Sequence, residues 1–289
     1  MDGIFNIYKE AGLRSYSVVE HLKAAFRTSK AGYAGTLDNF ASGVLLCGVN
    51  QATRILKYFL TLDKEYVAVV VLGRTTNTLD PQGEVSATGR ADIPAAEVES
   101  CLKTFVATFP QVPPVFSSKK IGGKRSSDLA RMGQAVELKP SMVTVHSLTM
   151  EDFDASGRFT IRVRCSTGTY VRALARDIGL KLGTVAMLEK LERTANGRYP
   201  SSESRRTGDL DPERDMIPMR ESLYFLDEIK LRAEAVQKAK NGVLLGPDDF
   251  NSRNLINGVY KVIFDGLLLS IVEKQDDRFL YLDNFATDI

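Results

Sequence analysis

Alternating hydrophobic residues predict the strands of a sheet. In residues 159–165 every second side chain is apolar, with Arg162 and Arg164 between them, which is the pattern of a strand with one buried face. Residues 64–72 are apolar at both sets of alternate positions, so we expect a strand in the middle of the sheet. A short strand is also predicted over residues 3–9.

Helical spacing of apolar residues predicts three helices in the same part of the chain. Ser17 is expected to cap the first one. Its apolar face consists of Val18, Val19, Leu22 and Phe26. The second is predicted over residues 95–108, and the third follows a turn at 166–169 and ends at Gly183.

The pattern of predicted elements changes near residue 226. Beyond it we expect one helical stretch at 232–241 and short strands at 258–264, 267–273 and 278–282. The pattern predicts two domains, a larger one over residues 1–225 and a small β-rich one over residues 226–289.

Composition indicates an ordinary globular chain of 289 residues, 44% hydrophobic and 26% charged. No apolar run approaches the length of a membrane span, and the N-terminus lacks the features of a secretion signal, so we expect a cytoplasmic protein. With three scattered cysteines and two histidines, His21 and His146, we expect buried free thiols, structural histidines and no metal site.

Positive charge is unevenly distributed, although the net charge is only +2. Residues 158–176 contain five arginines and no acid, and residues 117–131 and 190–206 are also basic. One basic face for phosphate contacts would explain this asymmetry. Solvated faces of strands and helices would explain it equally well.

A glycine-framed turn places one carboxylate, Asp38, just before an apolar run that begins at Val44. Glycines at 32, 35 and 43 suit the close approach of another molecule to the main chain, which is a setting for an acid, base or nucleophile. The alternative is that Asp38 caps the turn or a helix, as aspartate commonly does.

Two separate motifs carry a resemblance to a known family. Residues 32–45 resemble the catalytic motif of the TruB family of bacterial tRNA pseudouridine synthases, Gly-x-x-Gly-Thr-Leu-Asp-x-x-Ala-x-Gly-Val-Leu. Residues 165–172 resemble that family's Cys-Ser-x-Gly-Thr-Tyr-Ile/Val-Arg segment. The family isomerises a uridine of the TΨC loop of tRNA, conventionally position 55, to pseudouridine.

The resemblance implies a role for each matching residue. Asp38 would be the essential carboxylate, and Arg172 would pair with it and keep it ionised. Tyr66 would stack on the flipped uracil, with Tyr170 and Leu191 lining its pocket. Without the resemblance, an aromatic residue of a strand such as Tyr66 is more commonly packed in the core. The matching motif neighbours are Lys9, Tyr33, Gly35 and Thr36.

The resemblance also implies an RNA-contacting insertion at about residues 110–140 and a fold. The expected fold is α+β, a mixed, mainly antiparallel sheet flanked by helices, with a PUA-like RNA-binding domain at the C-terminal end. The candidate RNA contacts are Lys119, Lys120, Lys124, Arg125, Arg131 and Arg193.

Several positions depart from the family pattern. Tyr33 replaces its usual histidine, and Asn39 its proline. The other replacements are Glu10, Arg14, Phe116 and Ser127. These changes concern rate and substrate engagement more than the type of reaction.

The function we expect is a monomeric tRNA pseudouridine synthase that uses no cofactor, since a carboxylate suffices for the reaction. The sequence agrees with this expectation, because it has no nucleotide-binding glycine motif. The alternative is a tRNA-binding or tRNA-folding protein of the same family with weakened catalysis, suggested by Tyr33 and Asn39. A glycoside-processing enzyme would need a second carboxylate beside Asp38, and the sequence offers no convincing partner.

Overall fold

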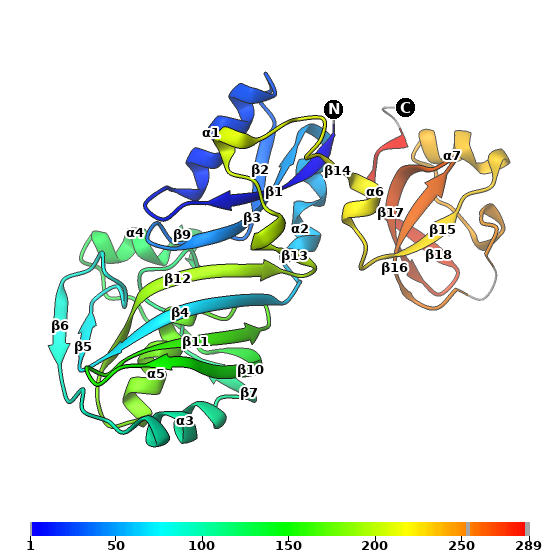
Figure 1. Ribbon diagram of the computed structural model, residues 1–289. Coiled ribbons are helices and arrows are strands. Elements are labelled where there is room, and N and C mark those ends of the chain that lie inside the picture. Colours follow the sequence, from blue (N-terminus) through cyan, green and yellow to red (C-terminus); the bar gives the residue numbers. More distant parts are fainter. Residues whose placement is uncertain (1, 253–254, 287–289) are drawn as a thin grey trace.

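Within the described residues, 2–252 and 255–286 of the computed structural model, ten strands form one large sheet (Figure 1). Their order is β14-β1-β3-β12-β4-β11-β10-β7, with β13 paired to β12 and β2 paired to β3. Each pairing is antiparallel except that of β3 with β12. The predicted mixed, mainly antiparallel sheet is therefore confirmed. The strands are β1 (Gly3–Lys9), β2 (Ala31–Ala34), β3 (Ser42–Val49), β4 (Lys64–Leu72), β7 (Thr108–Gln111), β10 (Ser141–Phe153), β11 (Arg158–Cys165), β12 (Ala186–Asn196), β13 (Tyr199–Pro200) and β14 (Ile217–Pro218).

The longer helices of the larger part cover one face of this sheet. The helix α5 (Val171–Lys181) packs on β12, and α3 (Ala95–Lys103) packs on β10; Figure 1 shows α5 behind the strands. Leu174 and Ile178 of α5 are fully buried in the largest apolar cluster, together with Val70 of β4. The helix α1 (Ser15–Ala25) packs on β2 and β3 on this face, whereas the short α2 (Leu56–Phe59) is buried in a different apolar cluster on the opposite face of β3. The apolar face of each predicted helix thus forms the core.

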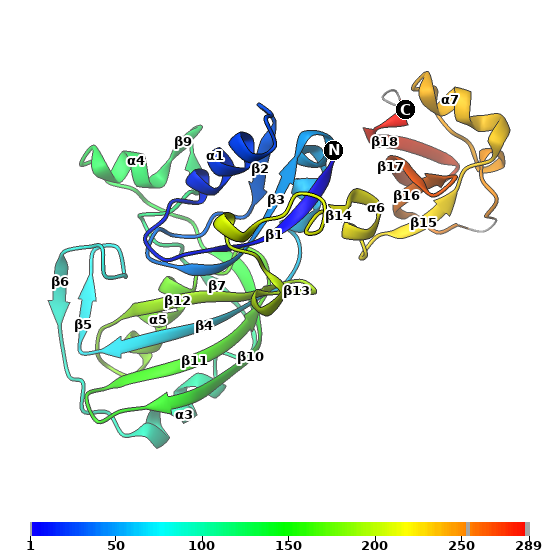
Figure 2. The ribbon, with the colours of Figure 1, turned by 45° about the horizontal axis from the view of Figure 1, so that its top comes forward.

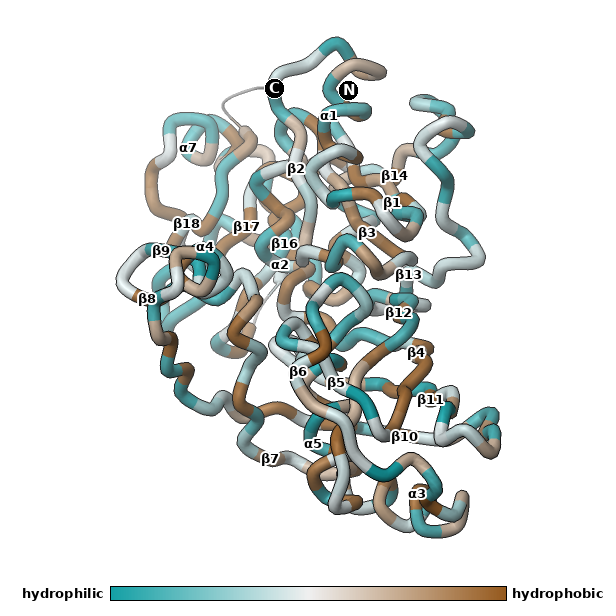
Figure 3. Tube along the Cα trace, turned by 90° about the vertical axis from the view of Figure 1, so that its left-hand side faces the viewer, coloured by the Kyte–Doolittle hydropathy of each residue, from teal (hydrophilic) through white to brown (hydrophobic). Residues whose placement is uncertain are grey.

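The strand β4 lies between β12 and β11, as its two apolar faces predict. Val70 points into the core, whereas Val67, Val69 and Val71 on the other face are only half-buried. That other face carries ion pairs, including Arg162 Nη1 to Glu65 Oε1 at 2.9 Å. Hydrophobic colour runs along β3 and β4 in Figure 3.

Two predicted helix boundaries are wrong. The first helix begins at Ser15, with Arg14 in the N-cap position, because the Ser15 hydroxyl bonds to the backbone of Leu37 and holds the chain there. The second helix ends at Lys103 and does not reach residue 108. Residues 108–111 leave it because their backbone pairs with β10 as strand β7.

Two small hairpins extend from the sheet. The first pairs β5 (Arg74–Thr76) with β6 (Val85–Thr88). The second lies in the predicted insertion and pairs β8 (Lys120–Ile121) with β9 (Lys124–Arg125), followed by α4 (Ser126–Arg131). Figures 1 and 2 both show β9 and α4 near α1, across from the β5–β6 hairpin.

The C-terminal part has its own sheet, in the order β15-β16-β17-β18. Its elements are β15 (Asp227–Lys230), α7 (Val236–Lys240), β16 (Gly258–Phe264), β17 (Leu267–Gln275) and β18 (Arg278–Asn284), and the short helix α6 (Met219–Ser222) precedes them. The predicted small β-rich region is confirmed. Its helical stretch is shorter than expected, because a 3-10 turn at Ala233–Ala235 precedes α7. Residues 1, 253–254 and 287–289 of the two predicted domain ranges lie outside the described residues.

The two parts pack together through a shared apolar cluster. Phe285, Leu268 and Ile271 of the C-terminal part are buried against Ile4 and Phe59 of the larger part. Polar contacts surround this cluster at Asp283, whose carboxylate accepts a 2.6 Å hydrogen bond from the Tyr58 hydroxyl and lies 2.8 Å from Lys57 Nζ. The cluster and its polar border define one continuous interface.

All three cysteines are buried free thiols, as predicted. No helix in the described part of the chain is both long and apolar enough to cross a membrane.

Replacing Tyr58 by phenylalanine tests the polar border of this interface. Because the hydroxyl donates to a charged carboxylate that is 8% exposed, we expect Tyr58→Phe to lower the free energy of unfolding by about 1.5 kcal/mol. Urea unfolding measures the change. Tyr8→Phe is the matched control, since no hydrogen bond of the Tyr8 hydroxyl is found within the described residues; equal values for the two variants would contradict the prediction.

Candidate active site

A pocket of about 630 Å³ opens on the face of the sheet that carries α5, and Asp38 forms part of its wall. The start of α1, the turn after β2, the turn after β5, the insertion and the start of α5 all contribute to the lining. These segments are far apart in the sequence, so the pocket exists only in the folded chain. Of the predicted site residues, it brings together Asp38, Tyr33, Gly35, Thr36, Tyr66, Tyr170, Arg172, Leu191, Arg193, Arg125 and Arg131.

Asp38 and Arg172 form a two-point ion pair at the centre of this pocket. Arg172 Nε lies 2.8 Å from Asp38 Oδ2, and Arg172 Nη2 donates to Asp38 Oδ1 at 3.0 Å. The Arg172 side chain is 4% exposed, whereas that of Asp38 is 38% exposed. The arginine is therefore built into the wall, and the carboxylate faces the open space.

A second carboxylate, Asp80, holds the other side of Arg172. Its Oδ2 lies 3.4 Å from Arg172 Nη1, and that same nitrogen donates to the Thr78 carbonyl at 2.7 Å. The Phe116 carbonyl accepts from Arg172 Nη2 at 3.0 Å. The sequence analysis did not identify Asp80, which begins an Asp-Pro-Gln-Gly stretch. The available signal was an acid at the start of a turn, which is too common to indicate a site.

Burial raises the pKa of Asp38, and the nearby charge of Asp80 adds to this effect, while Arg172 opposes it. The sequence predicted that Arg172 would lower the pKa of Asp38. It did not predict that burial would raise this pKa by more. Asp38 is therefore a stronger proton acceptor than an ordinary aspartate once it is ionised.

The buried side chain of Lys9 supports the turn that carries Asp38. Lys9 is fully buried, and its Nζ donates to the carbonyls of Ala41 at 2.6 Å and Leu13 at 2.7 Å. Burial lowers the pKa of Lys9 to about 8, against the opposing influence of Asp38. The Ser15 hydroxyl bonds both to the Leu37 carbonyl at 3.0 Å and to the Leu37 amide at 3.1 Å. Lys9 thus supports the turn without lining the pocket.

Tyr66 and Leu191 come from neighbouring strands, β4 and β12. Tyr66 is half-buried: its ring packs against the core and also lines the pocket, so the two sequence interpretations are compatible. Burial raises the pKa of its hydroxyl. Tyr170 precedes the first turn of α5, and its backbone amide donates to Gln111 Oε1 at 2.9 Å.

Arg193, which the sequence suggested as an RNA contact, is buried. Its side chain is 2% exposed, its Nε donates to the Val44 carbonyl at 2.7 Å, and its Nη2 donates to the Gly35 carbonyl at 3.1 Å. Gly43 lies against the same strand, where a Cβ atom would meet the Arg193 carbonyl at 2.2 Å. Arg193 therefore ties the turn of Asp38 to β12.

The cations of the insertion differ in their surroundings. Lys120, Lys124 and Arg125 are exposed. Arg131 is exposed and pairs with Asp128 at 3.2 Å, whereas Lys119 Nζ donates to the Ser141 hydroxyl at 2.6 Å. The segment carries largely hydrophilic colour around β9 and α4 in Figure 3.

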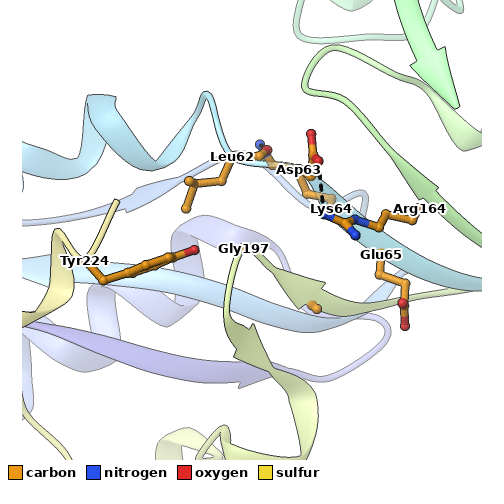
Figure 4. Close-up of a pocket in the computed structure, with 8 residues that line it drawn as sticks. Leu62, Asp63, Lys64, Glu65, Arg164, Gly197 and Tyr224 are labelled. Carbon is orange, nitrogen blue, oxygen red and sulfur yellow. Dashed lines mark hydrogen bonds and ion pairs between the residues drawn. The ribbon is translucent and has the colours of Figure 1, made fainter. Parts of the chain in front are cut away.

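A second pocket, of about 450 Å³, lies where β4 and β12 approach Tyr224 (Figure 4). Arg164 Nη2 lies 3.4 Å from Asp63 Oδ2 at its edge, and Lys64 lines both pockets. No group of three or more potential metal ligands occurs among residues 2–252 and 255–286.

Comparison with known proteins gives concordant matches. The family described as TruB family pseudouridylate synthase (N terminal domain) matches residues 23–171. The tRNA pseudouridine synthase B of Clostridium kluyveri is 33% identical over 92% of this chain and 93% of its own. That of Thermotoga maritima is 37% identical over 83% of this chain and 78% of its own. A solved H/ACA RNP bound to a substrate RNA containing 2′-deoxyuridine shares the fold, with a TM-score of 0.75 and 21% identity over 98% of this chain and 84% of its own.

The raised pKa of Asp38 predicts how its carboxyl group titrates. We expect it to stay protonated to a higher pH than an ordinary aspartate, and Asp80→Asn to lower its pKa by removing a neighbouring negative charge. Carbon-13 NMR of aspartate-labelled protein measures both, with Asp38→Asn assigning the signal. Asp154, whose pKa is lowered by its hydrogen bond from Ser156, is the internal reference. An Asp38 signal that titrates at or below the usual aspartate range contradicts the prediction.

Proposed function

Because the chain belongs to the TruB family of pseudouridylate synthases, we propose that it isomerises a uridine of tRNA to pseudouridine, at position 55 in the TΨC arm. The observation that carries this proposal is the pair of Asp38 and Arg172 at the centre of the pocket, with the carboxylate facing the open space. The relatives named above supply the substrate class, tRNA.

The reaction moves one bond and one proton. The glycosidic bond between N1 and C1′ breaks, the base turns, C5 bonds to C1′, and the proton that leaves C5 is balanced by one taken up at N1. Asp38 can act as a nucleophile or stabilise the electron-poor sugar carbon, and it can accept the proton from C5. Its raised pKa suits the last of these roles.

The side chains around Asp38 suit a flipped nucleotide. Turning a base out of its stack costs a few kcal/mol, which aromatic stacking and phosphate contacts offset. We assign the stacking to Tyr66 and part of the apolar wall to Leu191 on the neighbouring strand, with Tyr170 also lining the pocket. Arg172 and Asp80 are positioning residues, since both act through Asp38.

The remaining parts extend the RNA surface in this proposal. The exposed cations of the insertion contact phosphates, and residues 226–289 form a PUA-like RNA-binding domain beside a catalytic domain of residues 1–225. The protein acts as a monomer, in the cytoplasm where tRNA is processed.

Asp38→Asn tests the reaction directly. We expect pseudouridine formation in a TΨC stem-loop to fall by at least about 100-fold, because the amide neither attacks carbon nor accepts a proton at neutral pH. Product analysis by mass labelling measures this, and a binding titration checks that affinity for the RNA is retained. Comparable turnover by the variant would remove Asp38 from the chemistry. RNA binding without product by either protein would favour the tRNA-binding alternative.

Replacing Lys120 or Lys124 by alanine tests the insertion. Each lost phosphate contact should reduce the slope of log affinity against log salt concentration by about 0.7–0.9. Lys103→Ala, at an exposed position on α3, is the control that should leave the slope unchanged. If both insertion variants retain the full slope, the insertion does not contact phosphates.

A further inference from the structure

The segment from Arg14 to Tyr16 lines the same pocket as Asp38, yet the proposed chemistry gives it no role. Arg14 is exposed, and Tyr16 is 55% exposed although it is a large aromatic residue. Ser15, between them, is buried. The segment therefore presents a cation and an aromatic ring to the pocket mouth on either side of an anchored residue.

Hydrogen bonds hold this segment in register with the carboxylate. The Ser15 hydroxyl exchanges two bonds with the backbone of Leu37, which directly precedes Asp38. The Gly12 amide donates to the Asn39 carbonyl at 2.7 Å, directly after Asp38. Arg14 and Tyr16 consequently have a fixed position relative to the centre of the pocket.

Arg14 lacks a protein partner among the described residues. Within residues 2–252 and 255–286 no ion pair or hydrogen bond involves its guanidinium, and the first turn of α1 contains no acidic residue. A cation at the amino end of a helix opposes the helix dipole, so this placement is locally unfavourable. An anion bound at the pocket mouth would remove that cost.

The opposite side of the mouth is also cationic. Arg125 and Arg131 line the pocket from β9 and α4, which both ribbon views place near α1 (Figures 1 and 2). A polyanionic strand entering between the two sides meets positive charge on both. On the side of α1, Tyr16 offers an exposed aromatic ring for stacking.

We propose that Arg14 and Tyr16 bind the nucleotide next to the flipped uridine, Arg14 through its phosphate and Tyr16 by stacking on its base. This inference rests on the proposed function. When the uridine leaves the stack, the neighbouring base loses a partner and exposes one face, which an aromatic ring can cover. Arginine is suited to the phosphate because its planar fork donates two parallel hydrogen bonds.

The two contacts have different signatures in a binding experiment. We measure affinity for a TΨC stem-loop RNA at several salt concentrations, in the Asp38→Asn background so that no turnover occurs. Arg14→Ala should reduce the slope of log affinity against log salt by about 0.7–0.9, and Arg14→Lys should restore it. Tyr16→Ala should weaken binding about fivefold or more without changing the slope, and Tyr16→Phe should bind as the parent does.

Controls separate this inference from the function on which it rests. Arg74→Ala removes another exposed arginine outside the pocket and should leave the slope unchanged. Thermal unfolding of every variant checks that the fold is retained. An unchanged slope in Arg14→Ala together with unchanged affinity in Tyr16→Ala overturns the inference. If the wild-type protein forms no pseudouridine in the same RNA, the proposed function itself fails, whatever the binding data show.

Discussion

The burial of one guanidinium group constrains the whole site. Removing a charged group from water costs several kcal/mol unless partners are supplied, and Arg172 is almost completely buried. Its partners are Asp38, Asp80 and the carbonyls of Thr78 and Phe116, which belong to three separate segments. The same guanidinium therefore holds the turn after β2, the turn after β5 and the insertion in place. Because Asp38 and Asp80 share this one cation, Arg172 does not neutralise the negative charge of both carboxylates.

Sequence reasoning identified both members of the central ion pair. Asp38 and Arg172 stand in motifs that are 134 positions apart, and each motif is long enough to be specific. Asp80 was missed because its importance lies in a contact across the fold, which no local pattern records. The direction of the Asp38 pKa was missed for the same reason, since burial is a property of the assembled pocket.

The wrong expectations share a physical cause as well. Arg193 belongs to a basic stretch, but charge in a strand reveals nothing about which face a side chain takes, and this one points into the protein. The helix predicted over residues 95–108 stops early because sheet pairing satisfies the backbone of residues 108–111 better than another helical turn would. Periodicity predicted the type and order of the elements, whereas tertiary contacts decided their ends.

The apolar cluster between the two parts of the chain has a consequence for recognition. Rotating the C-terminal sheet away from the larger one would expose Phe285 and Leu268 to water, and burial of such side chains is worth roughly 1.5–3 kcal/mol each. The separation between that sheet and Asp38 is therefore set by this packing. A ligand that contacts both Asp38 and the C-terminal sheet would have to match this separation.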